Sequence, residues 1–432
     1  MCLSLVSWWI IIYILAYRMI AYMDIAAKDN NPNAPVMPYF AVFMSIWSTF
    51  LLEGWKRKEK LHAMKWGMVG FEDNEEQRPQ FKGDLIPNPI TGELFEYFPR
   101  NEYMKRMSLS TTIVSVCILV VLGVVISIFI LKIVLSTVRA LVIGGTQVGG
   151  IITSLVNAVQ IQVLNILYGT VAIKLTKYEN HRTETEFEDS LIAKTFIFQF
   201  INSFSPMFYI AFVKPFIPSM DACLISCMNE LQTSLGTIFM TRLVVGSITA
   251  VVVPYMANIS REKANLEGTK FKAKDMSEAE RGFMQEEYHV MLGPFADFAN
   301  LTIQFGYTTM FVVAFPLATV LAFVSNYIEI RIGAWKLCQL FRRPEPRSNE
   351  DIGTWCTIFE IIAFCAAIVN AGLVAFTSTI TINHAWPARV WIFFAISLLL
   401  TSVKFIIQMI TPDVPEEVDI QVCLVLLFRC LS

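Results

Sequence analysis

Uncharged polar side chains recur at helical spacing inside two strongly apolar segments. The first stripe consists of Thr153, Asn157 and Gln160. The second stripe consists of Thr195, Gln199, Asn202 and Tyr209. Intervals of three, four and seven residues place each stripe on one face of a helix. Such faces can solvate anions or lipid headgroups without binding them tightly. Alternatively, they can hydrogen-bond one helix to another, and the residues by themselves favour this second role.

A single arginine, Arg242, lies inside a third apolar segment at residues 233–257. Between Gly236 and Ala257 this segment contains no Asp, Glu, Asn or Gln that could accompany it. A guanidinium at membrane depth is unfavourable unless it is paired or serves a function. Arg242 therefore either pairs with a carboxylate on another helix or attracts anions from a polar groove.

No residue pattern typical of an enzyme or of a nucleic-acid-binding protein is present. The histidines fall in or beside different loops, at His62, His181, His289 and His384. Cys223 and Cys227 lack a second cysteine pair or a nearby histidine to complete a metal site, which leaves one disulfide or two thiols. The net charge is −2, and no basic patch interleaved with aromatic residues indicates a nucleic-acid partner. We expect no enzyme activity, no certain cofactor and no nucleic acid.

The elements that carry these residues are membrane-spanning helices. Hydrophobic residues make up 55% of the chain and charged residues 16%, well below the quarter that is usual in soluble domains. Apolar windows long enough to cross a bilayer lie near 3–22, 36–55, 110–135, 148–173, 195–214, 233–257, 356–378 and 388–411. A further apolar region, 295–333, would measure above ~50 Å as one helix and is divided by Pro316.

Basic residues predict which connections face the cytosol. The segments 56–107, 174–194, 258–294 and 331–355 carry 25 Lys and Arg, whereas the alternate connections carry five. The positive-inside rule places the first set in the cytosol. Both flanks of 295–333 are then cytosolic, so that region should form two short helices that turn near Pro316. This gives ten helices with both termini cytosolic, the first within 3–22 because no basic region or cleavage site of a signal peptide is present.

The predicted organisation follows from these spans. The segments are 1–55 (helices one and two), 56–107 (cytosolic loop), 108–257 (helices three to six), 258–294 (cytosolic linker), 295–333 (hairpin of helices seven and eight), 334–355 (cytosolic loop), 356–411 (helices nine and ten) and 412–432 (C-terminal tail). The fold class is an all-α polytopic membrane protein.

Four stretches of the sequence resemble the anoctamins, a family of chloride channels and phospholipid scramblases. They are residues 40–44 with 53–58, residues 175–191 with 200–212, residues 303–306 through 315–318 to 328–331, and residues 351–355 with 376–378. The resemblance implies a homodimer of ten-helix subunits in which helices seven and eight form a short hairpin. It also implies that helices three to seven form a groove, along which chloride ions or lipid headgroups pass. The two polar stripes are then expected to line that groove.

The resemblance further implies a calcium site among helices six, seven and eight, from which this chain departs. The family supplies five carboxylates and one amide, whereas the matching positions on helices seven and eight are Asp297, Asn300, Glu329 and Gly333, with Asn326 as a neutral helper. No register of helix six supplies a ligand. We expect a vestigial site that binds calcium weakly at best. Arg242 either stands in for the missing cation beside Asp297 or Glu329, or lies nearer the outer half and faces the groove.

The predicted function is transport of chloride, phospholipids or both along the polar groove, without gating by micromolar calcium. The alternative is a membrane tether or scaffold at contact sites that has the same fold. Replacing Gln199 and Asn202 with Leu is expected to slow flux with little loss of folding, since Leu is at home in lipid. The sequence does not distinguish the plasma membrane from the endoplasmic reticulum.

Overall fold

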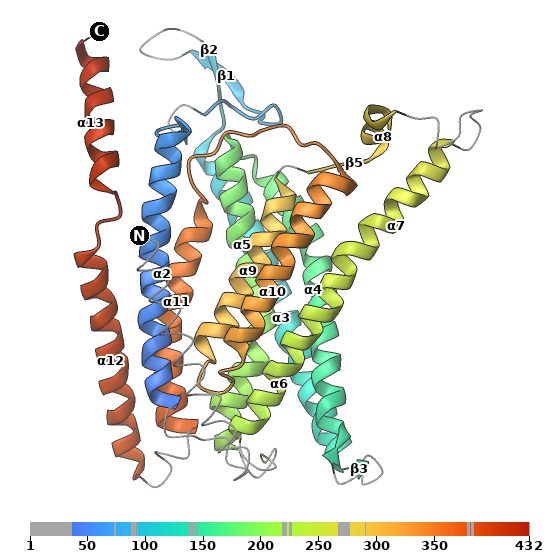
Figure 1. Cartoon of the computed structure of the whole chain (residues 1–432), viewed down its shortest axis with the longest axis vertical. Helices are drawn as coiled ribbons and strands as arrows, with labels where there is room; N and C mark the ends of the chain where they lie inside the picture. The colour runs from blue at the N-terminus through green and yellow to red at the C-terminus, as the bar shows by residue number, and fades with distance from the viewer. Residues whose placement is uncertain are drawn as a thin grey trace.

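A computed structural model describes residues 37–72, 75–87, 92, 94–137, 142–143, 146–217, 223, 227–266, 277–289, 291–377, 381 and 384–431. The first predicted span, near 3–22, lies outside these residues. The long helices are α2 (Met37–Lys65), α3 (Arg100–Thr137), α4 (Val148–Glu179), α5 (Glu184–Phe208), α6 (Cys227–Thr241), α7 (Ser247–Leu266), α9 (Leu292–Met310), α10 (Ala318–Trp335), α11 (Thr354–Gly372) and α12 (Trp386–Ile410). Figure 1 shows them as one bundle.

Short elements extend or connect these helices. π-helical turns continue α5, α6, α10 and α11, at η3 (Tyr209–Val213), η5 (Arg242–Gly246), η7 (Lys336–Leu340) and η8 (Leu373–Thr377), and η4 (Lys214–Phe216) is a 3-10 turn. The remaining helices are α8 (Glu278–Met284) and α13 (Glu416–Leu431), the latter within the 412–432 tail. Three two-stranded sheets pair β1 (Asp84–Pro87) with β2 (Leu94–Tyr97), β3 (Val142–Ile143) with β4 (Thr146–Gln147), and β5 (Glu286–Glu287) with β6 (Phe341–Arg342).

The expected all-α membrane bundle is confirmed. Within the described residues, six helical stretches are long and apolar enough to cross a membrane: Arg100–Leu131, Ile152–Glu179, Glu184–Phe216, Cys227–Arg261, Thr354–Thr377 and Trp386–Ile410. The predicted single span at 233–257 consists of α6 and α7, which the π-helical turn η5 joins. Cys223 and Cys227 form a disulfide at the start of α6.

The hairpin predicted around Pro316 is also confirmed. α9 ends at Met310 and α10 begins at Ala318, and the tight turn between them includes a hydrogen bond from the Ala318 amide to the Phe315 carbonyl at 3.0 Å. Pro316 favours this turn because proline disfavours a helical conformation in the residue before it. The hairpin turns short of the lower end of α12 in Figure 1. The upper face in that view carries the predicted cytosolic segments, and we call it the basic face.

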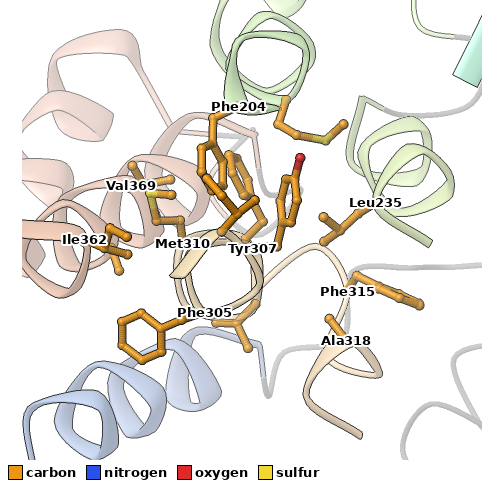
Figure 2. Close-up of a cluster of buried hydrophobic side chains, with 14 of the residues drawn as sticks. Phe204, Leu235, Phe305, Tyr307, Met310, Phe315, Ala318, Ile362 and Val369 are labelled. Atoms are coloured by element: carbon orange, nitrogen blue, oxygen red, sulfur yellow. The ribbon is translucent and has the colours of Figure 1, made fainter. Parts of the chain in front are cut away.

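Helix α9 is the centre of the hydrophobic core. Its residues from Thr302 to Met310 are all buried, and they pack against α5, α11 and α2. Figure 2 shows Tyr307 and Met310 of α9 beside Phe204 of α5, with Ile362 of α11 on another side. A Cβ atom at Gly306 would lie 2.6 Å from the Phe204 ring, so this close approach of α5 to α9 requires glycine.

On the basic face, the loop after α2 docks on the turn between α4 and α5. Arg78 forms an ion pair with Glu184, and its guanidinium lies 3.9 Å from the centre of the Phe187 ring. The side chain of Asn180, which has a φ of 61°, accepts a hydrogen bond from the Lys82 amide at 3.1 Å and donates one to the Lys82 carbonyl at 2.8 Å. These contacts fix the basic-face ends of α4 and α5.

Candidate functional site

Asn202 joins the two predicted polar stripes by hydrogen bonds. Its side chain is fully buried. The Asn202 amide nitrogen donates to Asn165 Oδ1 at 2.9 Å and to the Ile161 carbonyl at 3.2 Å, and Asn202 Oδ1 accepts from Gln160 Nε2 at 2.8 Å. The structure therefore brings Gln160 and Asn202 together as a tie between α4 and α5. For these two residues it favours helix-to-helix bonding over exposure to a groove.

Thr153 and Asn157 lie nearer the end of α4 that is opposite to the basic face, where four helices meet. Both side chains line a small cavity of about 20 Å³ that α3, α4, α5 and α6 enclose. That volume holds about one water molecule. Asn157 Oδ1 is buried and accepts no hydrogen bond within the described part of the chain. Next to the cavity, Ser154 Oγ on α4 lies 3.5 Å from Ser234 Oγ on α6.

The other members of the α5 stripe are dispersed. Thr195 is buried, whereas Gln199 and Tyr209 are half-buried. The Tyr209 ring packs on Phe129 of α3, with 4.1 Å between ring centres. The sequence predicted that the two stripes line a shared groove, which stays a prediction, and these side chains do not form one continuous exposed strip.

A larger groove lies along α6, a helix on which the sequence analysis singled out Arg242 but no polar stripe. It measures about 530 Å³. Its lining residues are Leu155, Asn229, Gln232, Thr233, Gly236, Thr237, Met240, Thr241 and Phe315. Seven of these belong to α6 and recur at intervals of one, three and four residues, the same signal that identified the other stripes. Amides, hydroxyls and apolar groups line this groove, and none of its lining side chains is charged.

The neighbouring elements hold α6 in this position. Lys214 of η4 is buried, and its Nζ lies 2.8 Å from Glu230 Oε2 in the first turn of α6. On the opposite face of α6, Leu231, Leu235 and Phe239 are buried against the core. The first turn of α6 is therefore fixed. The polar face of α6 is directed toward α4 and the hairpin turn.

The residues expected at a vestigial metal site lie on facing stretches of α9 and α10. Gln304 Nε2 donates to the Ala322 carbonyl at 3.1 Å. In an antiparallel hairpin this register places Asn300 near the level of Asn326 and Asp297 near the level of Glu329. Glu329 Oε1 accepts a hydrogen bond from Ser325 Oγ at 3.3 Å.

Arg242 faces this hairpin rather than the α6 groove. It is the first residue of η5, and such π-helical turns are frequent at functional sites. The guanidinium carbon lies 5.6 Å from the centre of the Tyr307 ring, within the range of a cation–π contact. The Tyr307 hydroxyl donates to the Ser203 carbonyl at 2.9 Å, so this contact fastens α6 to α9 and α5.

Two cations act on the carboxylates of the hairpin. The charges of Arg242 and Lys336 both reach Glu329, and the charge of Lys336 also reaches Asp297. Among the ion pairs of the described residues, none joins Arg242 to Asp297 or Glu329 within 4 Å. The same residues contain no group of three or more His, Cys, Asp or Glu side chains placed to hold a metal ion.

Comparison with known proteins identifies the relatives of this chain. Residues 1–423 match the family described as "Anoctamin: Calcium-activated chloride channel". Anoctamin-7 from Homo sapiens is 34% identical over 365 residues, which cover 79% of this chain and 39% of that protein. Anoctamin-10 from Homo sapiens is 30% identical over 392 residues (88% and 57%), and anoctamin-4 from Mus musculus is 34% identical over 367 residues (79% and 38%). The chain thus spans between 38% and 57% of the length of these relatives.

Proposed function

Because this chain belongs to the anoctamin family, which it matches over residues 1–423, we propose that it transports chloride ions, phospholipids or both across the membrane in which it is embedded. The observation that carries this proposal is the groove of about 530 Å³ along α6. Its uncharged amides and hydroxyls can replace part of the hydration shell of an anion or headgroup without trapping it.

The proposed path runs along the seam between α4 and the α6–α7 pair. Thr153 and Asn157 lie beside this seam in the small cavity between α3, α4, α5 and α6. Gln199 lies on α5 and Tyr209 on η3, which continues that helix. Asn202 and Gln160 act here as ties that keep α4 aligned with α5, since both take part in the hydrogen bonds of that interface.

We further propose that micromolar calcium does not gate transport. A calcium ion takes six to eight oxygen ligands, and the hairpin offers the carboxylates of Asp297 and Glu329 with the amides of Asn300 and Asn326. The charge of Lys336 acts on both carboxylates, and the charge of Arg242 acts on that of Glu329. These residues do not fit a calcium ion, because like charges repel it and too few oxygens replace its water. Arg242 stands in for the cation by fastening α6 to α9.

A tether or scaffold without transport is the second candidate function. The closed contact of α4 with α6, with 3.5 Å between the Ser154 and Ser234 hydroxyls, favours it. So does the complete burial of Asn202 in an interhelical hydrogen-bond network. Both observations describe a bundle that holds its helices together rather than one that opens.

A flux measurement separates these functions. The purified chain is reconstituted into liposomes that contain a fluorescent phospholipid, and into others loaded with chloride, at zero and at high calcium. We expect lipid exchange or chloride efflux above that of empty liposomes at both calcium levels. Absence of both fluxes from a correctly folded, reconstituted chain would favour the tether. Assembly as a homodimer is a separate proposal from the family, and cross-linking in membranes tests it.

A further inference from the structure

The segment that connects β6 to α11 carries an exposed serine, Ser348, which two acidic residues follow closely. This connecting segment, residues 343–353, contains no helix or strand, and Figure 1 shows it crossing the basic face of the bundle. Pro344 and Pro346 favour an extended chain, because the residue before a proline disfavours a helical conformation. Ser348 is therefore an accessible hydroxyl in an extended stretch.

The two acidic residues after Ser348 are loosely held. Glu350 Oε2 accepts a hydrogen bond from the Glu72 amide at 3.4 Å, and Asp351 Oδ2 lies 3.7 Å from Lys60 Nζ. Both distances exceed the usual length of a hydrogen bond. A small movement of the connecting segment therefore presents both carboxylates to another protein.

We propose that Ser348 is a phosphorylation site for a Ser/Thr kinase that selects acidic segments, and that the phosphate releases the connecting segment from α5. Ser348 Oγ attacks the γ-phosphorus of Mg²⁺-bound ATP, the bond from this phosphorus to the oxygen of the β-phosphate breaks, and ADP leaves. The hydroxyl proton passes to the catalytic carboxylate of the kinase. The inference goes beyond the proposed transport and needs only a cytosolic basic face, as the basic residues predict.

The charges around Ser348 indicate the class of kinase. Kinases distinguish their substrates by the pattern of charge around the serine. Acids at the second and third positions after it suit a cleft with basic side chains, whereas kinases that select arginine read the positions before it, which here include Glu345 and Pro346. Ser277 also precedes an acid, Glu280, but its hydroxyl already takes part in the capping box of α8.

A phosphate on Ser348 opposes the attachment of the segment to α5. Arg347 Nη1 lies 2.9 Å from Glu188 Oε2 of α5. The phosphate adds a charge of about −1.5 to −2 at pH 7 beside this arginine, and phosphate is a strong partner for a guanidinium. It therefore competes with Glu188 for Arg347, and it also repels the carboxylates of Glu350 and Asp351. Both effects favour the released segment.

Phosphate incorporation tests the site. The purified full chain in detergent is incubated with Mg²⁺ and ATP and either casein kinase 2, which selects acidic segments, or the catalytic subunit of cAMP-dependent kinase, which selects arginine. Mass spectrometry should locate phosphate on Ser348 with the first kinase only, and Ser348→Ala should lack it. Asp351→Asn keeps an oxygen for the Gly353 amide that Asp351 Oδ1 accepts but removes the charge, so modification should slow ~10-fold. Glu345→Gln, an exposed acid before the serine, is the matched control and should not slow it.

Hydrogen exchange tests the release. The Ile352 amide donates to Glu59 Oε1 at 2.7 Å and the Thr354 amide to Asp189 Oδ1 at 3.0 Å, so exchange of these amides reports whether the segment stays docked. Loss of an ion pair of this kind should speed their exchange ~3-fold in the phosphorylated chain. Arg347→Gln without phosphate should give a similar increase, because it removes the same ion pair. The amides of the β1–β2 hairpin serve as the internal reference.

These measurements decide the inference separately from the proposed function. A folded chain that takes no phosphate on Ser348 from active casein kinase 2, or equal rates for Asp351→Asn and the wild type, overturns the site. Unchanged exchange after complete phosphorylation overturns the release. If Asp351→Asn does not fold, the two kinases acting on the wild type and on Ser348→Ala carry the test. Absence of flux from the wild-type chain contradicts the transport proposal and leaves the phosphorylation result standing.

Discussion

Asn202 shows which of two roles a polar residue can take in an apolar helix. A polar stripe in an apolar helix indicates either a wet path or a tie between helices, and the hydrogen bonds to Gln160, Asn165 and Ile161 favour the tie. The expectation that leucine at this position leaves folding intact must therefore be revised. Its partners would lose their bonds inside the bundle.

Asn202→Leu is accordingly expected to destabilise the protein. Leaving a buried polar partner without a bond costs about 1–3 kcal/mol, so the midpoint of thermal unfolding in detergent should fall. The matched variant is Gln199→Leu on the same helix, where the side chain is half-buried, and its midpoint should change little. Equal midpoints for the two variants would contradict the role of Asn202 as a tie.

The polar residues of α6 give the opposite expectation. Gln232→Leu and Thr237→Val place apolar groups in the groove along α6, so lipid or chloride flux should slow several-fold while the unfolding midpoint changes little. Thr401→Val on α12, outside the proposed path, is the control, because Thr401 makes the same kind of bond within its own helix, to the Ser397 carbonyl at 2.8 Å, as Thr237 makes to Thr233. Flux that slows equally in the control would indicate a general effect of removing hydroxyls.

At the scale of elements, the loop after α2 meets the loop before α11 through a cluster of carboxylates. Partial desolvation, and then the negative charges of Asp351, Glu350 and Asp189, raise the pKa of Glu72 to about 7. The Glu72 amide also donates to Glu350 Oε2 at 3.4 Å. The folded chain therefore holds a proton that the unfolded chain loses near its ordinary value of 4.5.

This raised pKa predicts a pH dependence of stability. The folded state binds more protons than the unfolded state between about pH 4.5 and 7, so the free energy of unfolding falls as the pH rises through that window. Glu72→Gln removes the titration, and its unfolding midpoint should therefore fall less than that of the wild type between about pH 5 and 7.5. Glu76→Gln, an exposed change outside the cluster, should behave as the wild type. Identical pH profiles for wild type and Glu72→Gln would contradict the role of the cluster.

Several elements could be predicted from the sequence because their signals are local. Pro316 interrupts an apolar region that is too long for one helix, and the hairpin turns there. The α6 groove also had a local signal, the intervals between Asn229, Thr233 and Thr237, but the first of these residues lies before the predicted span 233–257. The contact between Glu72 and Glu350 had no signal, since it joins residues 278 positions apart.

At the scale of the whole molecule, the distribution of charge predicted the arrangement of helices better than the surroundings of any single charge. The 25 basic residues on alternate connections required an even number of passes through 295–333, as the hairpin shows. The sequence offered Asp297 and Glu329 as partners for Arg242, yet the guanidinium lies over Tyr307. That contact depends on how α6, α9 and α10 pack together, which no pattern within one helix contains.

The same packing leads to the prediction about gating. The charge of Lys336 acts on both carboxylates of the hairpin and the charge of Arg242 on that of Glu329, so any flux of the wild-type chain should be constitutive and unchanged by micromolar calcium. Affinity at calcium sites varies over several decades with the number of charged ligands, and two carboxylates beside two cations should bind in the ~millimolar range at best. Arg242→Ala removes part of the repulsion and the contact with Tyr307, so it should lower the unfolding midpoint and introduce a response to millimolar calcium. Arg331→Ala is the matched control, because Arg331 also lies over a tyrosine ring, that of Tyr327 at 5.3 Å, but on the exposed side of α10. Activation of the wild-type chain by micromolar calcium, or a calcium response in Arg331→Ala equal to that of Arg242→Ala, would contradict the assignment of Arg242 as the substitute for the ion.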